Sequence, residues 1–276
     1  MRSAVHYLPI ATTLIALPFA AVVLGRWRAR GGTHLLWWGL GLVAYGVGTA
    51  IEAAVTLFGW SEPLFKAWYV AGALLGGAPL AQGTVYLLLP RTTANRLTAT
   101  LLSVIAVAAL CVLAAPVDTA LAEPHRLTGR VLAWSWVRLF SPFINLYAFV
   151  FLVGGAAVSA WRYGRQPGAR HRAVGNALIA LGALLPGIGG SATRFGHTEV
   201  LYVTELAGVV LLWLGYRTVV REGASALAAP RPASNSWARD PHLPAFSRAR
   251  LRGRRAPAHR HHHRIPGAPP PDHRVG

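Results

Sequence analysis

The chain has 276 residues, of which 54% are hydrophobic and 13% are charged, and its formal net charge is +18. Soluble domains carry about twice that share of charged residues, so the composition argues against a soluble fold. It favours an all-α, polytopic membrane protein, because helices are the usual way to satisfy the backbone in lipid.

Seven apolar runs follow one another along the chain. Runs of about 18–25 apolar residues have the length that a helix needs to cross a hydrocarbon core of about 30 Å. The sequence therefore predicts seven transmembrane helices, at Leu8–Gly25, Leu35–Phe58, Ala67–Leu89, Leu97–Ala115, Pro142–Trp161, Ala173–Ala192 and Val200–Tyr216.

The arginines between the runs predict the orientation of the chain. Arg26 and two further arginines follow the first run, whereas the positive charge of a signal peptide precedes its apolar region, so we expect a true first span. Short arginine-containing loops at 26–34, 90–96 and 162–172 all fall on one side of the membrane. Because such loops stay in the cytoplasm, the N-terminus is expected outside and the C-terminus inside.

One ten-residue stretch occurs twice. Thr56–Phe65 and Thr193–Tyr202 share Thr, Phe, Gly, Glu and Leu at the same places, and each lies at a corner between two apolar runs. Gly59 and Gly196 suit the left-handed residue that ends a helix. The next residues are predicted to start the following helix, with a capping hydroxyl and then a glutamate, namely Ser61 and Glu62, and Thr198 and Glu199.

The same spacing extends beyond the corners. A shift of 137 residues also places His34 on His171, at the start of the second and sixth runs. The sequence therefore predicts two parallel three-helix halves, at residues 8–89 and 142–218, with a linker helix at 97–115. This 3+1+3 plan resembles that of parallel-repeat bundles such as the SWEET-type transporters and the opsins.

Two glutamates are predicted inside the membrane at similar depth. Glu52 lies about two turns before one corner and Glu205 about two turns after the other, which places both about 10 Å below the outer surface. An ionised carboxylate is costly there unless it is paired or faces a polar interior. Two interpretations stay open: the acids line a solute cavity, or they are protonated and hold helices together.

Further polar residues complete the predicted cavity. The candidate solute-binding residues are Tyr45, Glu52, Gln82, Tyr86, Asn145, Asn176 and Glu205, and Arg194 is a candidate member of an outer gate ion pair. Pro79 and Pro186 are expected to kink or break the third and sixth helices. Glycines recur every seven residues in the sixth run, at Gly175, Gly182, Gly189 and Gly196, and favour close helix packing.

Catalytic signals are absent from the sequence. It shows no paired carboxylates, no nucleophile–base set and no metal-ligand spacing, so neither an enzyme nor a bound cofactor or metal is predicted.

Two segments lie outside the apolar runs. The outer connection at 116–141 carries Trp134 and Trp136 and is expected to lie at the lipid–water interface. The seven-helix domain is predicted to cover residues 1–222, followed by a disordered, basic cytoplasmic tail at 223–276. Its arginines at 248–255 suit anionic lipid headgroups, and no nucleic-acid partner is expected because no nucleic-acid-binding fold accompanies them.

Several phrases of the sequence resemble an uncharacterised family of bacterial seven-helix membrane proteins. The phrases are Thr33–Gly39, Ala67–Ala73, Gln82–Leu88, Ser141–Tyr147 and His171–Asn176. The resemblance covers about Arg26 to Arg217 and carries no known activity. A retinal photoreceptor is excluded, because the only lysine, Lys66, lies at an outer corner and the seventh run has none.

These observations lead to a functional hypothesis. We expect a transporter or carrier of the bacterial inner membrane that binds a small polar or cationic solute between its two halves. The alternative is a membrane sensor or scaffold without transport activity.

Overall fold

The computed structural model describes residues 4–123 and 127–228. Within these residues the regular elements are helical, apart from one isolated antiparallel bridge between Val117 and Leu132. Seven helical stretches are long and apolar enough to cross a membrane, at Ala4–Arg30, Thr33–Phe58, Glu62–Leu88, Arg91–Ala114, Ser135–Gly164, Arg170–Thr193 and Thr198–Val220. We refer to them as spans 1 to 7. They confirm the prediction of seven membrane-crossing helices.

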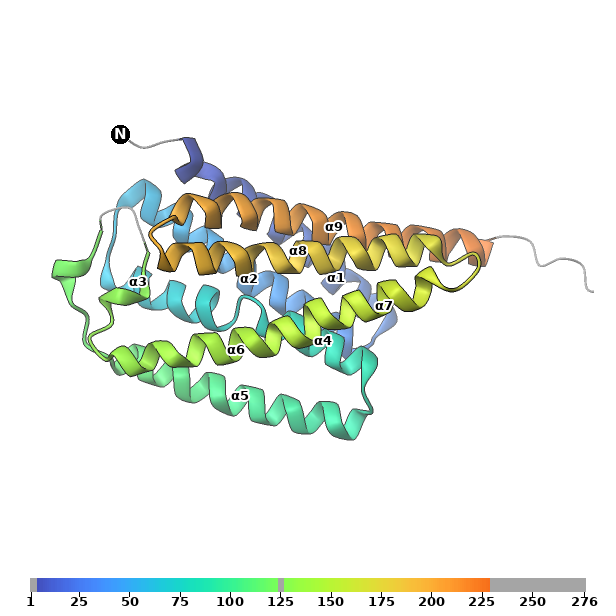
Figure 1. Ribbon diagram of the computed structural model, residues 1–276, viewed down its shortest axis with the longest axis horizontal. Helices are drawn as coiled ribbons and strands as arrows, with labels where there is room; N and C mark the ends of the chain where they lie inside the picture. Colours follow the sequence, from blue (N-terminus) through green and yellow to red (C-terminus); the bar gives the residue numbers. More distant parts are fainter. Residues whose placement is uncertain (1–3, 124–126, 229–276) are drawn as a thin grey trace, which may run out of the picture. The chain divides into compact units, whose positions relative to one another are not determined.

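Five spans are dominated by one long helix (Figure 1). The short 3-10 turn η1 (Ala4–Tyr7) precedes the helix of span 1. The five helices are α1 (Leu8–Arg30), α2 (Thr33–Phe58), α5 (Arg91–Ala114), α8 (Arg170–Arg194) and α9 (Thr198–Ala228). The helix α9 thus continues past residue 222, where the predicted tail begins, and the rest of that tail lies outside the described residues.

Spans 3 and 5 are interrupted helices. Span 3 consists of α3 (Glu62–Trp68), the π-helical η2 (Tyr69–Leu74) and α4 (Ala78–Leu88), with a break between the last two. Pro79 lies in the first turn of α4, where its missing N–H leaves no hydrogen bond unmade. The predicted interruption at Pro79 is therefore present. Pro186, in contrast, lies inside the continuous helix α8.

Span 5 has a similar mixed structure. It begins with the 3-10 turn η5 (Ser135–Leu139) and α6 (Phe140–Ala148), and it continues through the π-helical η6 (Phe149–Gly154) into α7 (Gly155–Gly164). A π-helical turn inserts one residue into the helix and rotates the side chains that follow.

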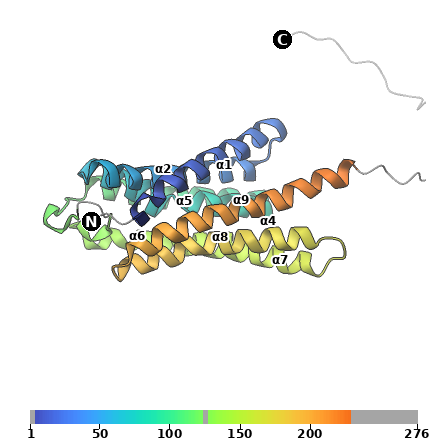
Figure 2. The ribbon, with the colours of Figure 1, turned by 90° about the horizontal axis from the view of Figure 1, so that it is seen from above.

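The spans contact one another largely in chain order. The helix α1 packs against α2 and α9, α2 packs against span 3, span 5 packs against span 3 and α8, and α8 packs against α9. The helix α5 of span 4 packs mainly on spans 3 and 5 and lies at the edge of the bundle in Figure 1. Figure 2 shows α1 and α2 together on one side, with α7 and α8 on the other.

The glycines of α8 allow close contact with α9. A Cβ atom added at Gly182 would lie 2.7 Å from the carbonyl oxygen of Gly208, and one at Gly175 would lie 2.9 Å from that of Gly215. A Cβ at Gly189 would lie 2.7 Å from the Cα of Leu201. The predicted glycine stripe therefore serves helix packing.

The two repeated corners agree with the prediction only in part. Gly59 and Gly196 have φ angles of 93° and 98°, a conformation that favours glycine. Ser61 occupies the position before α3, but its side chain makes no capping hydrogen bond. Thr198 is already the first residue of α9, and its Oγ1 has no partner among the described residues. The predicted hydroxyl caps are therefore wrong, since neither side-chain oxygen accepts from the first N–H groups of the following helix.

Candidate functional site

The centre of the candidate site is a pair of carboxyl groups that the structure brings together. Glu52 of α2 and Glu205 of α9 bring their carboxyl groups next to each other. Glu52 is only 3% exposed, and the Oε2 atoms of both acids are buried and have no hydrogen-bond partner within the described residues. We call Glu52 and Glu205 the acid pair. The sequence shows no paired carboxylates, because these two residues are far apart in the chain.

Two aromatic side chains hold the acid pair in place. Trp68, the last residue of α3, donates its indole N–H to Oε1 of Glu52 at 2.8 Å. Tyr45 donates its hydroxyl to the backbone oxygen of Glu205 at 2.9 Å. A carbonyl oxygen has two lone pairs, so it can accept this bond in addition to its helical one. Tyr45 thereby links α2 to α9 beside the acids.

Helix geometry explains why these residues meet. Tyr45 and Glu52 are seven residues apart in α2 and so project from the same face of the helix. Gly48, between them, lets α2 approach span 3, since a Cβ there would lie 3.1 Å from the Cα of Gly72. This approach brings the end of α3, and with it Trp68, next to Glu52. The acid pair therefore joins spans 2, 3 and 7.

A single bound proton would stabilise the acid pair. Two ionised carboxylates are both acceptors, whereas a carboxyl group that carries a proton can donate a hydrogen bond to the other. Two negative charges buried next to each other would also repel each other strongly. The neighbouring acids are thus suited to hold one proton between them.

A second polar cluster is built around Gln82 of α4. Its Nε2 donates to Oγ1 of Thr98 at 2.6 Å and to the backbone oxygen of Ala94 at 3.2 Å. Its Oε1 accepts from the hydroxyl of Tyr147 at 2.6 Å. Tyr86 joins the cluster, since its hydroxyl accepts from Thr98 at 3.0 Å. Gln82 has no exposed surface, and these bonds use its hydrogen-bonding groups.

The other predicted site residues do not join either cluster. Asn145 is exposed, and its Nδ2 is 3.5 Å from the backbone oxygen of Ala73. Asn176 donates to the oxygen of Arg172 in its own helix at 2.8 Å. The side chain of Arg194 lies outside the described part of the structure. The structure therefore brings Tyr45, Glu52 and Glu205 together and places Gln82 and Tyr86 in a separate cluster.

Sequence reasoning missed the roles of Trp68, Thr98 and Tyr147. Trp68 contacts Glu52 only because α3 folds back along α2 after the corner. Its position nearly two helix turns after Glu62 places it near the depth of Glu52, which is the signal that could have found it. Thr98 gives no such signal, since it comes from span 4 and its partner Gln82 comes from span 3.

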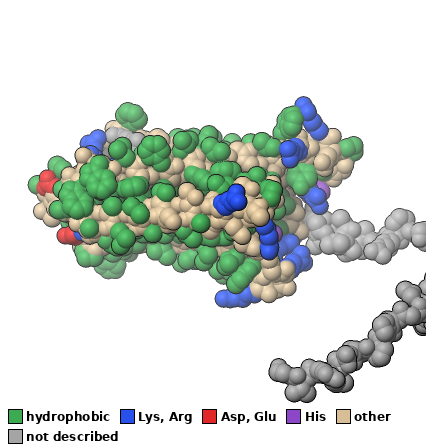
Figure 3. Space-filling view, turned by 90° about the horizontal axis from the view of Figure 1, so that it is seen from below, with side chains coloured by type: hydrophobic (Ala, Val, Ile, Leu, Met, Phe, Trp, Pro, Cys, Tyr) green, Lys and Arg blue, Asp and Glu red, His purple; other side chains and the backbone are tan. Residues whose placement is uncertain are grey.

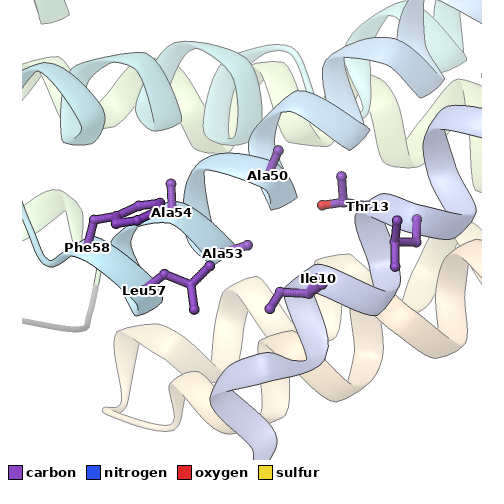
Figure 4. A pocket seen from close by; sticks show the side chains of 8 residues that line it. Ile10, Thr13, Ala50, Ala53, Ala54, Leu57 and Phe58 are labelled. Carbon is purple, nitrogen blue, oxygen red and sulfur yellow. The ribbon is translucent and has the colours of Figure 1, made fainter.

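An apolar hollow lies between α1 and α2, away from the acids (Figure 4). Its volume is about 250 Å³. Its lining residues are Ile10, Thr13, Leu14, Ala50, Ala53, Ala54, Leu57 and Phe58. The hydroxyl of Thr13 is bonded to the oxygen of Pro9 at 2.8 Å and to Thr49 Oγ1 at 2.9 Å. No acid lines this hollow.

Metal-binding groups do not gather in the described residues. No three or more His, Cys, Asp or Glu side chains there lie close enough to hold a metal ion.

Comparison with known proteins finds neither a matching protein-family model nor a matching curated protein. The class of the protein rests on its fold: it has the seven apolar helices of a multi-pass membrane protein. The resemblance to a bacterial seven-helix family remains a prediction.

Proposed function

We propose that this protein is a carrier of the bacterial inner membrane that moves a small polar or cationic solute and takes up or releases a proton at the acid pair. The burial of Glu52 and Glu205 side by side, with both Oε2 atoms unpartnered in the described residues, supports this proposal more than any other observation. An acid inside a membrane helix is costly, and such acids commonly mark ion and proton pathways.

The position of the acid pair fits an alternating carrier. Glu52 belongs to span 2 and Glu205 to span 7, so each proposed three-helix half contributes one acid. When the halves move apart, the acids separate and each carboxyl becomes free to bind a cationic solute or to lose its proton. The observed arrangement, with both Oε2 atoms buried, is then the closed state of the carrier.

The proposal includes the parallel 3+1+3 repeat and the N-outside, C-inside orientation. The peripheral packing of α5 on spans 3 and 5 fits the role of a linker helix. Figure 3 shows arginine and lysine side chains mostly at one end of the helices on that face, and acidic ones at the other. The arginine-rich end would face the cytoplasm. The predicted contact of the basic tail with anionic lipid remains part of the proposal and concerns residues outside the described range.

A sensor or scaffold is the second candidate function. The observation that favours it is the filled interior: Gln82 is fully buried and already bonded to three groups, and the Oε2 atoms of the acid pair are buried as well. In that case the acid pair serves to hold spans 2 and 7 together, without solute movement.

Proton movement in proteoliposomes tests the carrier proposal. The full chain is reconstituted with a pH-sensitive dye inside the vesicles, and gradients of methylammonium, guanidinium or glycine are applied. We expect at least one gradient to drive a pH change that Glu52→Gln and Glu205→Gln abolish. Glu62→Gln, at a half-exposed corner residue, is the matched control and should behave as the unmodified protein.

Two results would contradict the proposal. One is a folded wild-type protein that moves no protons with any of the three gradients. The other is equal proton movement in the wild type and in both glutamine variants of the acid pair. Either result favours the sensor or scaffold.

A further inference from the structure

Three unpartnered polar groups lie at the outer ends of the helices that carry the acid pair. Thr56 of α2 has no exposed surface, and Thr198 of α9 is 5% exposed. Within the described residues, neither Oγ1 atom has a hydrogen-bond partner, and the indole nitrogen of Trp60 also has none. A buried polar group without a partner costs about 1–3 kcal/mol, so three such groups in one region need an explanation.

The register of the two helices aligns these groups with the acids. Thr56 is four residues from Glu52 in α2, on the same face and about 6 Å nearer the outer end. Thr198 is seven residues from Glu205 in α9, again on the same face and about 10 Å nearer the outer end. Because the two acids lie next to each other, the two threonine faces continue outward from their meeting point.

Other buried threonines show that the missing bonds are not forced by the helix. Thr12 returns its hydroxyl to the oxygen of Leu8 at 3.1 Å, and Thr49 bonds the oxygen of Gly46 at 3.2 Å. Thr56 could make a similar bond to the oxygen of Glu52 by rotating its side chain, and it does not. Its hydroxyl is therefore left available for another partner.

We propose that Thr56, Trp60 and Thr198 line a narrow hydrated path that connects the acid pair to the outer surface, and that this path is the route by which the acid pair exchanges its proton. The proposal deepens the proposed function, since it depends on a proton held by Glu52 and Glu205. A hydroxyl both donates and accepts, so it can hold a water on either side, and a buried water usually makes about three hydrogen bonds.

The length of the path fits a short chain of waters. The outermost of these groups, Thr198, is about 10 Å from the level of the acids. Waters about 2.8 Å apart would span this distance in about four steps. The turn η1 contacts α2 and α9, and it supplies no hydrogen-bond partner to Thr56 or Thr198.

Infrared spectroscopy of the full chain in lipid nanodiscs tests the path. The protonated carboxyl of the acid pair has its own carbonyl stretch, which shifts when the proton is replaced by deuterium. After transfer to D₂O, we expect Thr56→Val and Thr198→Val to slow this shift about tenfold each. A tenfold change corresponds to about 1.4 kcal/mol, the scale of one lost hydrogen bond to water.

Matched variants serve as controls for this test. Thr56→Ser and Thr198→Ser retain the hydroxyl and should exchange at the wild-type rate. Thr12→Val removes an equally buried hydroxyl that is bonded to its own helix, and it should also leave the rate unchanged. Both valine variants should fold, because neither hydroxyl has a partner to lose within the described residues.

The outcomes separate the path from the function it serves. Unchanged exchange in both valine variants, or equal slowing in Thr12→Val, overturns the path and leaves the acid pair intact. A carbonyl stretch that persists in the double variant Glu52→Gln/Glu205→Gln, or is missing from the wild type, overturns the proton at the acid pair and with it the basis of the proposed function.

Discussion

The indole of Trp68 is the one neutral donor that holds a defined oxygen of the acid pair. Hydrogen bonds to a charged acceptor contribute about 1.5–3 kcal/mol to stability. The indole N–H of Trp68 donates a bond of this kind to the carboxyl group of Glu52. A donated hydrogen bond stabilises a carboxylate more than a carboxylic acid, so the indole of Trp68 would favour Glu52 as the acceptor and Glu205 as the proton-bearing partner in the proposed shared-proton arrangement.

Replacement of Trp68 should therefore weaken the fold through one hydrogen bond. We expect Trp68→Phe to lower the free energy of unfolding by about 2 kcal/mol, measured by circular dichroism in a mild detergent. Trp60→Phe is the control, because its indole N–H has no partner in the described part of the chain. Equal losses in the two variants would show that the bond to Glu52 contributes nothing, and the effect of Trp68→Phe should shrink when Glu52 is already Gln.

The acids themselves could be predicted from the sequence, but their contact could not. Their equal distance from two matched corners gave the depth of Glu52 and Glu205. Their contact depends on how α2 and α9 are rotated about their axes, which is set by side-chain packing across spans 1, 2 and 7. Asn145 shows the opposite outcome: its polarity suggested the interior, yet the π-helical turn and the packing of span 5 leave it exposed.

At the scale of elements, α8 and α9 form the closest helix pair described above. Gly182 faces the backbone of Gly208, whereas Gly187, only five residues later, has no atom within 4 Å of an added Cβ. The helix α8 therefore contains one glycine that is packed against α9 and one that has free space around it. Both have the same intrinsic helix propensity. Proline at position 186 does not break α8, and its ring lies against Gly208, since a Cβ there would be 3.0 Å from Pro186 Cδ.

This contrast gives a direct test of the helix packing. We expect Gly182→Ala to destabilise the protein by about 1–3 kcal/mol, because the added methyl group forces the helices apart. Gly187→Ala should be neutral or stabilising by up to about 1 kcal/mol, since alanine is the better helix former. Thermal unfolding of both variants in the same detergent measures this difference. A similar loss of stability in the two variants would contradict the close contact at Gly182.

The interruptions of spans 3 and 5 were only partly predictable. Pro79 indicated a break in span 3, and the preceding Gly76 and Gly77 weaken the helix further. Nothing in the residues around Phe149–Gly154 indicates a π-helical turn in span 5, because π-helical turns depend on tertiary contacts more than on residue preference. The residue types at the corners suggested caps, but whether a hydroxyl turns toward the free N–H groups depends on local packing that the sequence does not show.

For the whole molecule, the number of helices followed from the sequence because backbone satisfaction in lipid leaves little choice. The sequence did not predict which spans contact one another, because seven apolar helices can pack in several ways. The peripheral position of α5 is one such result: its polar inner end, at Thr98, joins the Gln82 cluster, while much of its apolar length is exposed.

Cysteine labelling on intact cells tests the orientation. With Cys111 replaced by alanine, Ser61→Cys and His197→Cys place a thiol at each repeated corner, and Gln166→Cys places one in the loop between α7 and α8. We expect an impermeant maleimide to label both corner variants from outside and to label position 166 only after permeabilisation. Labelling of the two corners from opposite sides would contradict the parallel repeat.

The matched corners also carry a pair of phenylalanines, Phe58 and Phe195, which are 84% and 82% exposed. Each directly precedes a corner glycine, so both project from the same rim of the bundle into the surrounding acyl chains, where phenylalanine is favoured. Two phenylalanine anchors at one rim would tie the depth of Glu52 and Glu205 to the leaflet at that rim instead of to the midplane. In bilayers of different thickness, we then expect the acids to keep their distance from the headgroups of that leaflet, with the mismatch taken up at the opposite rim.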